Sequence, residues 1–193
     1  MEKKTFFTEV LGIKNRELAD ALCEVSRIKN FEKDELLVRE DSMPAQLYIL
    51  LKGVCRGYFT SDNGRNITDC FPHKLGEALM GSFDLKEPTV LNVVAETKVE
   101  VMSIPMISLI HMLQEHVELV YVYNQMLSGA LSRHVGIKLA IYKHDAKGKY
   151  RWFLENYPGL IDIVKHRHVA SFLNITPESL SRVRKEWKQQ NEE

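Results

Sequence analysis

Four polar side chains near the C-terminus have types and spacing suited to reading DNA. Glu178, Ser181, Arg182 and Lys185 follow one another at steps of three, one and three residues, so a helix would present them on one face. A carboxylate accepts a hydrogen bond from cytosine N4, and a guanidinium grips guanine O6 and N7 together. The hydroxyl can contact base edges and the ammonium can touch phosphate. The set therefore predicts a surface that enters a groove of duplex DNA.

The helix that must carry these side chains has clear signals of its own. Thr176 supplies a hydroxyl for the N-cap, and Pro177 costs nothing at the first helical position because the N–H that it lacks has no partner there. Leu180, Val183 and Trp187 recur at steps of three and four on the opposite side. We expect that apolar side to pack inward.

A shorter helix is predicted just before it. Val169, Phe172 and Leu173 recur at helical spacing, and Asn174 tolerates the left-handed backbone that ends a helix. An ordinary helical hairpin with a solvated charged face is the alternative. The small residue Ala170, where two helices must cross, favours a DNA-binding helix-turn-helix.

The segment Glu178-Ser179-Leu180-Ser181-Arg182 resembles the E-x-x-S-R recognition-helix signature of the Crp/Fnr transcription regulators. The resemblance implies that Glu178 and Arg182 read a G·C pair in a TGA-containing half-site. It also implies double-stranded DNA with a palindromic operator, a homodimer, and RNA polymerase as a further partner. The residues expected to contact DNA are Thr176, Glu178, Ser179, Ser181, Arg182, Lys185, Arg167 and Lys188, the last two as phosphate contacts.

In the first half of the chain, the apolar residues occur in short segments typical of β-strands. After a predicted helix from Asn15 to Arg27, segments rich in Val, Ile, Leu, Tyr and Phe are broken by turn residues. The predicted strand segments are Glu35 to Asp41, Gln46 to Thr60, Asn66 to Phe71 and Asn92 to Ile104. Together they predict a β-roll or jelly roll. The stretch Leu36 to Tyr58, with Lys52-Gly53, resembles the start of the cyclic-nucleotide-binding β-roll.

The resemblance weakens at the effector site. Gly76-Glu77 resembles the G-E pair whose carboxylate holds the ribose in that family, although a simple turn explains it equally well. The cationic Arg and the Ser of the family's cassette align with Thr89 and Val90. A buried cyclic phosphate without a cation would meet a large desolvation penalty. We therefore expect that cAMP is not the effector, unless Lys86 or Arg56 replaces the missing charge.

Other cofactor chemistries find little support. Cys23, Cys55 and Cys70 are few and widely spaced, which fits neither a disulfide framework nor an iron–sulfur cluster. Buried thiols acting as small hydrophobic groups are expected, with redox sensing as the alternative. His73 stands alone as a ligand for haem or metal. We expect no cofactor, no metal site and no enzymatic activity, and the small-molecule effector is left unidentified.

A long helix from Val117 to Tyr142 should lie between the two parts. Its apolar positions alternate at steps of three and four, as in the seam of a two-stranded coiled coil. The predicted seam consists of Val120, Tyr123, Leu127, Ala130, His134, Ile137 and Ile141. The resemblance implies that this helix forms the dimer interface, and packing on its own β-roll is the alternative.

Charge and composition fit this organisation. The 193 residues carry 26 basic and 26 acidic side chains, and the part from Lys143 onward has an excess of three positive charges. No long apolar span or leader-like segment occurs, so we expect a cytoplasmic protein without membrane contact. Ala146-Lys147-Gly148 marks the expected domain boundary. Leu160 to Val164 is predicted as a strand of a hairpin that would make the C-terminal part a winged helix.

The sequence thus predicts an α+β protein with three parts: a β-roll sensor (1–116), a dimerisation helix with its hinge (117–145), and a winged helix-turn-helix (146–193). The function expected is sequence-specific transcription regulation controlled through the β-roll. The alternative is a regulatory ligand-binding module whose C-terminal helices dock a protein partner. The exposed face with Ser181, Arg182 and Lys185 has no large apolar side chain, which disfavours that alternative.

Overall fold

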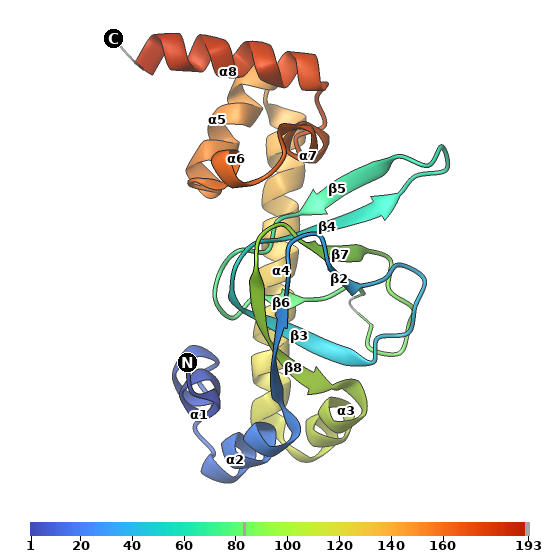
Figure 1. Ribbon diagram of the computed structural model, residues 1–193. Helices are drawn as coiled ribbons and strands as arrows, with labels where there is room; N and C mark the ends of the chain where they lie inside the picture. The colour runs from blue at the N-terminus through green and yellow to red at the C-terminus, as the bar shows by residue number, and fades with distance from the viewer. Residues whose placement is uncertain (83, 192–193) are drawn as a thin grey trace. The chain divides into compact units, whose positions relative to one another are not determined.

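The computed structural model describes residues 1–82 and 84–191 (Figure 1). The chain divides into two compact units. The first unit contains Met1–Phe59 and Phe71–Ala130, and the second contains Thr60–Cys70 and the residues from Leu131 onward. Within the described residues, no helix has both the length and the apolar character needed to cross a membrane.

Two four-stranded sheets occur in the described residues, and all of their strands except β5 lie in the first unit. Their strand orders are β1-β8-β3-β6 and β2-β7-β4-β5. The strands are β1 (Arg27–Phe31), β2 (Leu36–Val38), β3 (Gln46–Lys52), β4 (Cys55–Thr60), β5 (Asn66–Cys70), β6 (Ala78–Leu79), β7 (Asn92–Ala95) and β8 (Val99–Pro105). This arrangement confirms the predicted β-roll and each of the four predicted strand segments. Sequence patterns missed β1, whose side chains are mostly exposed, and β6, which has only two residues.

The core of this unit has two faces because the strands alternate their side chains. Leu50, Cys55 and Val101 are fully buried in the cluster between the two sheets. Ile49 and Met102 belong to a second cluster, which includes buried residues of the neighbouring helices. Burial of each large apolar side chain contributes about 1.5–3 kcal/mol, so these alternating residues fix the register of β3 and β8.

Helices cover one end of the sheets. They are α1 (Lys3–Thr5), the π-helical turn η1 (Phe6–Val10), α2 (Arg16–Val25) and α3 (Met106–Glu115). The predicted cap of α2 is confirmed, since Asn15 Oδ1 accepts a hydrogen bond from Leu18 N at 3.1 Å. The ammonium of Lys3 donates to the carbonyls of Cys23 and Ser26 at the other end of α2. It thereby satisfies two of the carbonyls that a helix end leaves free.

The long helix α4 (Val117–Lys143) contributes residues to both units. The second unit continues with α5 (Ala146–Asn156), α6 (Leu160–Ile163), α7 (His166–Phe172) and α8 (Pro177–Asn191). Ala146-Lys147-Gly148, expected to be a break, is the first turn of α5, which Asp145 caps.

The prediction of a strand from Leu160 to Val164 is wrong. The segment forms α6, which starts after Gly159 in a left-handed conformation (φ 76°). Leu160, Ile161 and Val164 are buried at helical rather than alternating spacing. Described residues 146–191 therefore contain no strand, and the hairpin of the predicted winged helix is absent from them. The strand of this unit is β5 instead, and it packs on α7.

Candidate nucleic-acid interface and effector site

The turn between α7 and α8 has the geometry expected of a helix-turn-helix. Asn174 adopts the left-handed conformation (φ 50°). The amide of Ile175 then donates to the carbonyl of Ala170 at 3.0 Å, which closes the turn. Ala170 is fully buried between the two helices' turn and the core, as expected for a small residue at a close crossing. The prediction from Ala170 and Asn174 is confirmed at the level of the backbone.

The start of α8 is fixed by its cap. Thr176 Oγ1 accepts a hydrogen bond from the amide of Ser179 at 3.2 Å, and it also contacts the Ser179 hydroxyl at 3.1 Å. Hydrogen bonds from its own backbone amide and from the Thr176 side chain hold the pKa of Glu178 below its usual value. A charged carboxylate at a helix N-terminus is favoured by the helix dipole. Thr176 and Ser179 are therefore engaged in the cap.

The two faces of α8 separate as predicted. Leu180 and Val183 are buried, and Trp187 packs edge-on against Tyr150 of α5 with ring centroids 6.1 Å apart. On the other face the side chains of Glu178, Ser181, Arg182, Lys185 and Lys188 are exposed. The polar face is thus presented by a helix whose apolar face is packed against α5 and α7.

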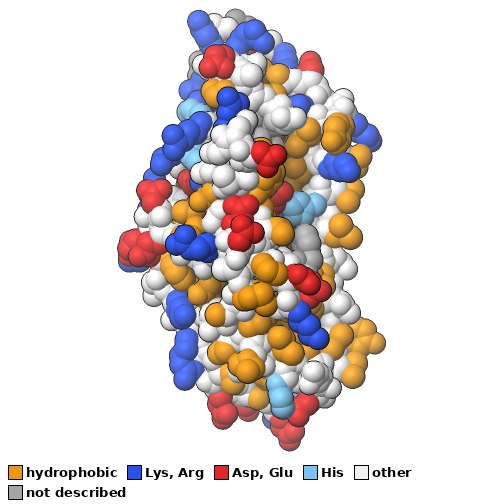
Figure 2. Space-filling view, turned by 90° about the vertical axis from the view of Figure 1, so that its right-hand side faces the viewer, with side chains coloured by type: hydrophobic (Ala, Val, Ile, Leu, Met, Phe, Trp, Pro, Cys, Tyr) orange, Lys and Arg blue, Asp and Glu red, His pale blue; other side chains and the backbone are white. Residues whose placement is uncertain are grey.

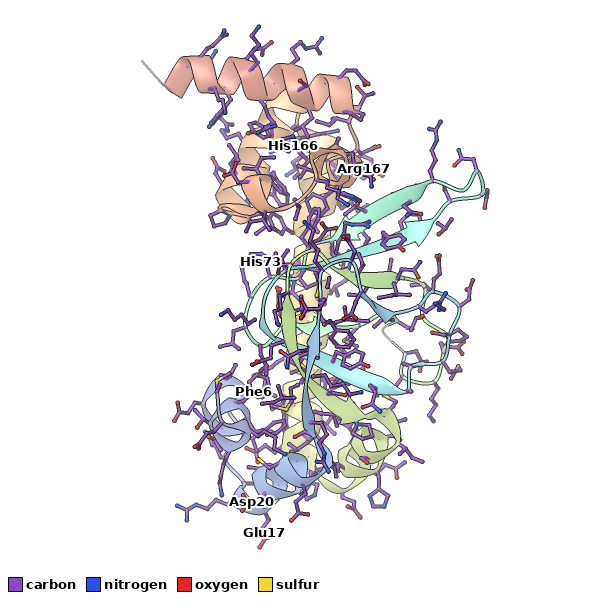
Figure 3. The ribbon with its side chains drawn as sticks, viewed as in Figure 1. Phe6, Glu17, Asp20, His73, His166 and Arg167 are labelled. Carbon is purple, nitrogen blue, oxygen red and sulfur yellow. The ribbon has the colours of Figure 1, made fainter. Side chains whose placement is uncertain are left out.

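Arg167 and its neighbour His166 lie at the start of α7 (Figure 3). Arg167 is exposed, and its Nε donates to His168 Nε2 at 3.2 Å. Sequence reasoning missed a contact between the two helices, in which Arg184 Nη1 lies 2.8 Å from His166 Nδ1. Arg184 belongs to neither face of the predicted α8, so periodicity gave no signal for it.

Strand β5 is tied to the helices of the second unit. The amide of Thr68 donates to Ser171 Oγ of α7 at 3.0 Å. His134 Nε2 of α4 lies 3.6 Å from Asp69 Oδ2. These contacts turn His134 towards its own protomer, whereas the sequence prediction had it in the dimer seam.

The predicted seam of α4 is largely covered within the protomer. Ile137 is buried, and the other six seam residues are half-buried. A different stripe is exposed, formed by Val117, Tyr121, Leu131, Val135, Leu139 and Tyr142. Successive helical residues are about 100° apart, and the two stripes are separated by roughly that angle. The predicted seam is therefore partly covered by its own chain, and its role as the dimer interface stays a prediction.

In the first unit, Gly76 and Glu77 form a turn before β6. Gly76 has a left-handed conformation (φ 84°), and a Cβ there would lie 3.2 Å from Val10 Cγ1. Glu77 is buried, and its Oε2 accepts hydrogen bonds from the amides of His73 (2.7 Å) and Lys74 (2.9 Å). The carboxylate therefore stabilises the turn that precedes it.

Thr89 and Val90 occupy the aligned positions of the cassette Arg and Ser, and they differ sharply in exposure. Thr89 is 1 % exposed, and its hydroxyl donates to the carbonyl of Arg39. Val90 is 63 % exposed. Thr89 holds a loop together, and Val90 faces solvent.

The two residues considered as replacement cations are differently placed. Arg56 is buried and its Nε lies 2.7 Å from Glu96 Oε1, with its guanidinium 4.3 Å from the centroid of the Tyr58 ring. Among the described atoms, Arg56 Nη1 has no hydrogen-bond partner. Lys86 is exposed. The charge of Arg56 is thus neutralised by the carboxylate of Glu96, which directly follows β7.

Of the three cysteines, Cys55 is buried, whereas Cys23 and Cys70 are half-buried. Cys55 is fully buried, and burial raises the pKa of its thiol to about 12. Burial also raises the pKa of Cys23. Within the described part of the chain, no three metal-binding side chains lie together.

Several known proteins resemble this chain in fold. Residues 28–116 match the family model of the cyclic nucleotide-binding domain. Among solved structures, FixK2 from Bradyrhizobium japonicum is 20% identical and has a TM-score of 0.74, with 86% of each chain covered. A transcriptional regulator of the Crp/Fnr family from Eubacterium rectale, described as putative, is 15% identical with a TM-score of 0.75, covering 96% of this chain and 88% of that one.

The c-di-GMP responsive global regulator CLP of Xanthomonas campestris is also similar, at 15% identity and a TM-score of 0.73, with 91% and 93% of the two chains covered. No curated protein matches the sequence. At these identities the structural likeness establishes a shared fold along nearly the whole chain.

Proposed function

We propose that this chain is a sequence-specific DNA-binding transcription regulator that works as a homodimer. Its residues 28–116 match the family model of the cyclic nucleotide-binding domain, and it has the fold of the Crp/Fnr regulators. The proposal divides the chain into a sensor (1–116), a dimerisation helix and hinge (117–145) and a DNA-binding part (146–193). RNA polymerase is proposed as a further partner.

One observation carries the DNA-binding role. Glu178, Ser181, Arg182 and Lys185 are exposed together on α8, while Leu180 and Val183 on its other side are buried. A helix that is rigidly packed on one side and lined with hydrogen-bonding groups on the other fits the major groove. Thr176 and Ser179 act through the cap, which positions Glu178. Arg167 and Lys188 are proposed to contact phosphates.

A palindromic operator requires two such helices related by two-fold symmetry. The exposed stripe of α4, with Leu131 62 % exposed and Val135 49 % exposed, supports dimerisation through this helix. Isolated exposed apolar residues are common on protein surfaces, but an aligned row along a long helix is typical of a helix–helix interface.

We also propose that DNA binding does not depend on cAMP. Thr89 is uncharged where the cassette carries its cation, and Glu77 is occupied by two backbone amides. Arg56 is paired with Glu96. A phosphate that took the Nε of Arg56 from Glu96 would leave a buried carboxylate alone, at a cost of several kcal/mol.

Fluorescence anisotropy on a TGA-containing palindrome and its single-base variants tests the proposal. Arg182→Ala should weaken binding to the intact site by about 1–3 kcal/mol and lose discrimination at one base pair. Lys188→Ala is the matched control, because loss of a phosphate contact should weaken all sequences alike. Addition of cAMP should leave the isotherms unchanged.

The same measurement separates DNA binding from the docking of a protein partner. Phosphate contacts release counterions, so affinity for DNA should fall steeply as salt is raised. If Arg182→Ala lowered the affinity for every DNA sequence equally, base recognition by Arg182 would be contradicted. Retention on duplex DNA that does not respond to salt would contradict the function itself.

A further inference from the structure

Two histidines at the start of α7 each lie against an arginine. Arg184 Nη1 of α8 is 2.8 Å from His166 Nδ1. Arg167 Nε donates in the same way to His168 Nε2 at 3.2 Å. A guanidinium has only N–H donors, so the imidazole nitrogen is the acceptor in each contact, and a protonated imidazole has no ring nitrogen left to accept. His166 is therefore neutral when it accepts from Arg184.

The contact between Arg184 and His166 ties α8 to α7 at a distance from their turn. At the turn itself, the amide of Ile175 donates to the carbonyl of Ala170. His166 is the first residue of α7, and Arg184 lies near the middle of α8. Ties at two different points along a pair of helices fix the rotation of one helix against the other. The rotation of α8 sets which side chains would enter the major groove.

Arg184 is poorly solvated apart from this contact. It is half-buried, and its Nε is a buried atom without a hydrogen-bond partner among the described residues. Because a buried donor of a charged group is costly to leave unpaired, loss of His166 as acceptor favours a movement of α8 that exposes the guanidinium to water. Arg182 and Lys185 lie within two positions of Arg184 on the exposed face. Such a movement would displace the side chains proposed to contact DNA.

The surroundings of the contact are rich in positive charge. Lys165 and Arg167 flank His166 in the sequence and are exposed. Strand β5, which packs on α7, carries the carboxylate of Asp69, and this carboxylate lies 3.6 Å from His134. Helix α5 meets α7 through aromatic rings. Figure 2 shows Lys and Arg side chains, with His among them, in its upper part, which the helices after α4 form. A proton on His166 would therefore add a cation where several already lie.

We propose that the contact between Arg184 and His166 makes sequence recognition sensitive to acid. Neutral His166 accepts from Arg184 and so positions α8, and protonation of His166 breaks the contact because two cationic donors then face each other. Histidine ordinarily changes charge between about pH 5 and pH 8, so mild acid is sufficient. His166 and Arg184 are positioning residues in this scheme. The inference rests on the proposed DNA binding and concerns its regulation.

Fluorescence anisotropy with the full chain at about pH 8 and about pH 5.5 tests the inference. The probes are the TGA-containing palindrome and a duplex of the same composition in shuffled order. On acidification, the ratio of the affinity for the palindrome to that for the shuffled duplex should fall about tenfold, as expected for the loss of one hydrogen bond to a charged group. Circular dichroism at both pH values checks that the protein stays folded. An unchanged ratio would overturn the inference.

Two substitutions at position 166 separate the acceptor from the charge. Asparagine places an oxygen close to the position of Nδ1 and does not titrate, so His166→Asn should keep the high ratio at both pH values. His166→Lys puts a permanent cation beside Arg184 and should show the low ratio at both. His144 is exposed and precedes α5 in the same unit, so His144→Asn is the matched control and should keep the response to acid.

Nitrogen-15 NMR of the imidazoles tests the contact without DNA. At the higher pH, His166 should show its proton on Nε2 and an unprotonated, hydrogen-bonded Nδ1. A proton on Nδ1 under these conditions would overturn the inference even if DNA binds normally.

The remaining outcomes separate this inference from the proposed function. A response to acid that survives His166→Asn would belong to another histidine. A ratio that rises in acid and no longer does so in His166→Asn would make His166 a cation that binds phosphate. Both results would overturn the inference and leave DNA binding intact. Failure of both duplexes to bind at the higher pH would contradict the proposed function itself, and the inference with it.

Discussion

The exposed stripe of α4 makes a sharp prediction about the dimer. Leu131 lies on that stripe and is 62 % exposed, whereas Leu127, one turn earlier, is half-buried. We compare Leu131→Gln with Leu127→Gln. Both changes replace the same apolar side chain with a polar one of high helix propensity, so α4 itself should be unaffected.

The magnitude follows from the exposed fraction. Complete burial of a leucine contributes about 1.5–3 kcal/mol, so a side chain that is still 62 % exposed has roughly 1–2 kcal/mol left to gain. Because a two-fold symmetric dimer contains Leu131 twice, the free energy of dimerisation should weaken by roughly 2–4 kcal/mol. Leu131→Gln should therefore increase the dimer dissociation constant by a factor between about 30 and several hundred.

Sedimentation equilibrium over a range of concentrations measures this constant, and circular dichroism checks that each protomer stays folded. Leu131→Gln should produce folded monomers at concentrations where the unaltered protein is dimeric. Leu127→Gln should lower the free energy of unfolding of the protomer and change the dimer constant less. The reverse result would refute our assignment of the interface and restore the seam that periodicity predicts.

Three further predictions concern the positions of buried or capping groups. Thr176→Ala removes the cap of α8, so it should destabilise the second unit by about 1 kcal/mol in thermal unfolding and weaken binding to all DNA sequences alike. Thr176→Ser should restore both the stability and the binding. Glu96→Gln leaves buried Arg56 without its anion and should cost about 3–5 kcal/mol in urea unfolding. Because burial raises the pKa of Cys55 to about 12 and alkylation needs the thiolate, mass spectrometry should find Cys55 unmodified by iodoacetamide at pH 8 until the protein is denatured.

Local signals predicted those elements whose ends are fixed by a few side chains. The caps at Asn15 and Thr176 and the left-handed Asn174 depend on residue chemistry within a few positions, and all three occur as expected. Strand β1 could not be found in this way. Its residues are mostly exposed, and pairing with β8, about seventy residues later, holds it in the sheet.

Periodicity failed where two patterns fit the same residues. The apolar run from Leu160 to Val164 fits a buried strand as well as a helix, and the left-handed Gly159 decides for α6. Helix α4 has apolar residues on two stripes, so spacing alone could not say which one faces the protomer. Contacts such as that between His134 and Asp69 decide it, and they join residues far apart in the sequence.

The charges of the β-roll narrow the chemistry of its effector. Comparison with the family's cassette motif indicates that a cation is missing, but the motif cannot show that one candidate replacement, Arg56, is already paired with Glu96. Recruiting the Nε of Arg56 to a phosphate would leave a carboxylate that is 95 % buried without its partner, at a cost of several kcal/mol. Glu96→Gln offers a further test, since it would free the Nε of Arg56 to bind phosphate.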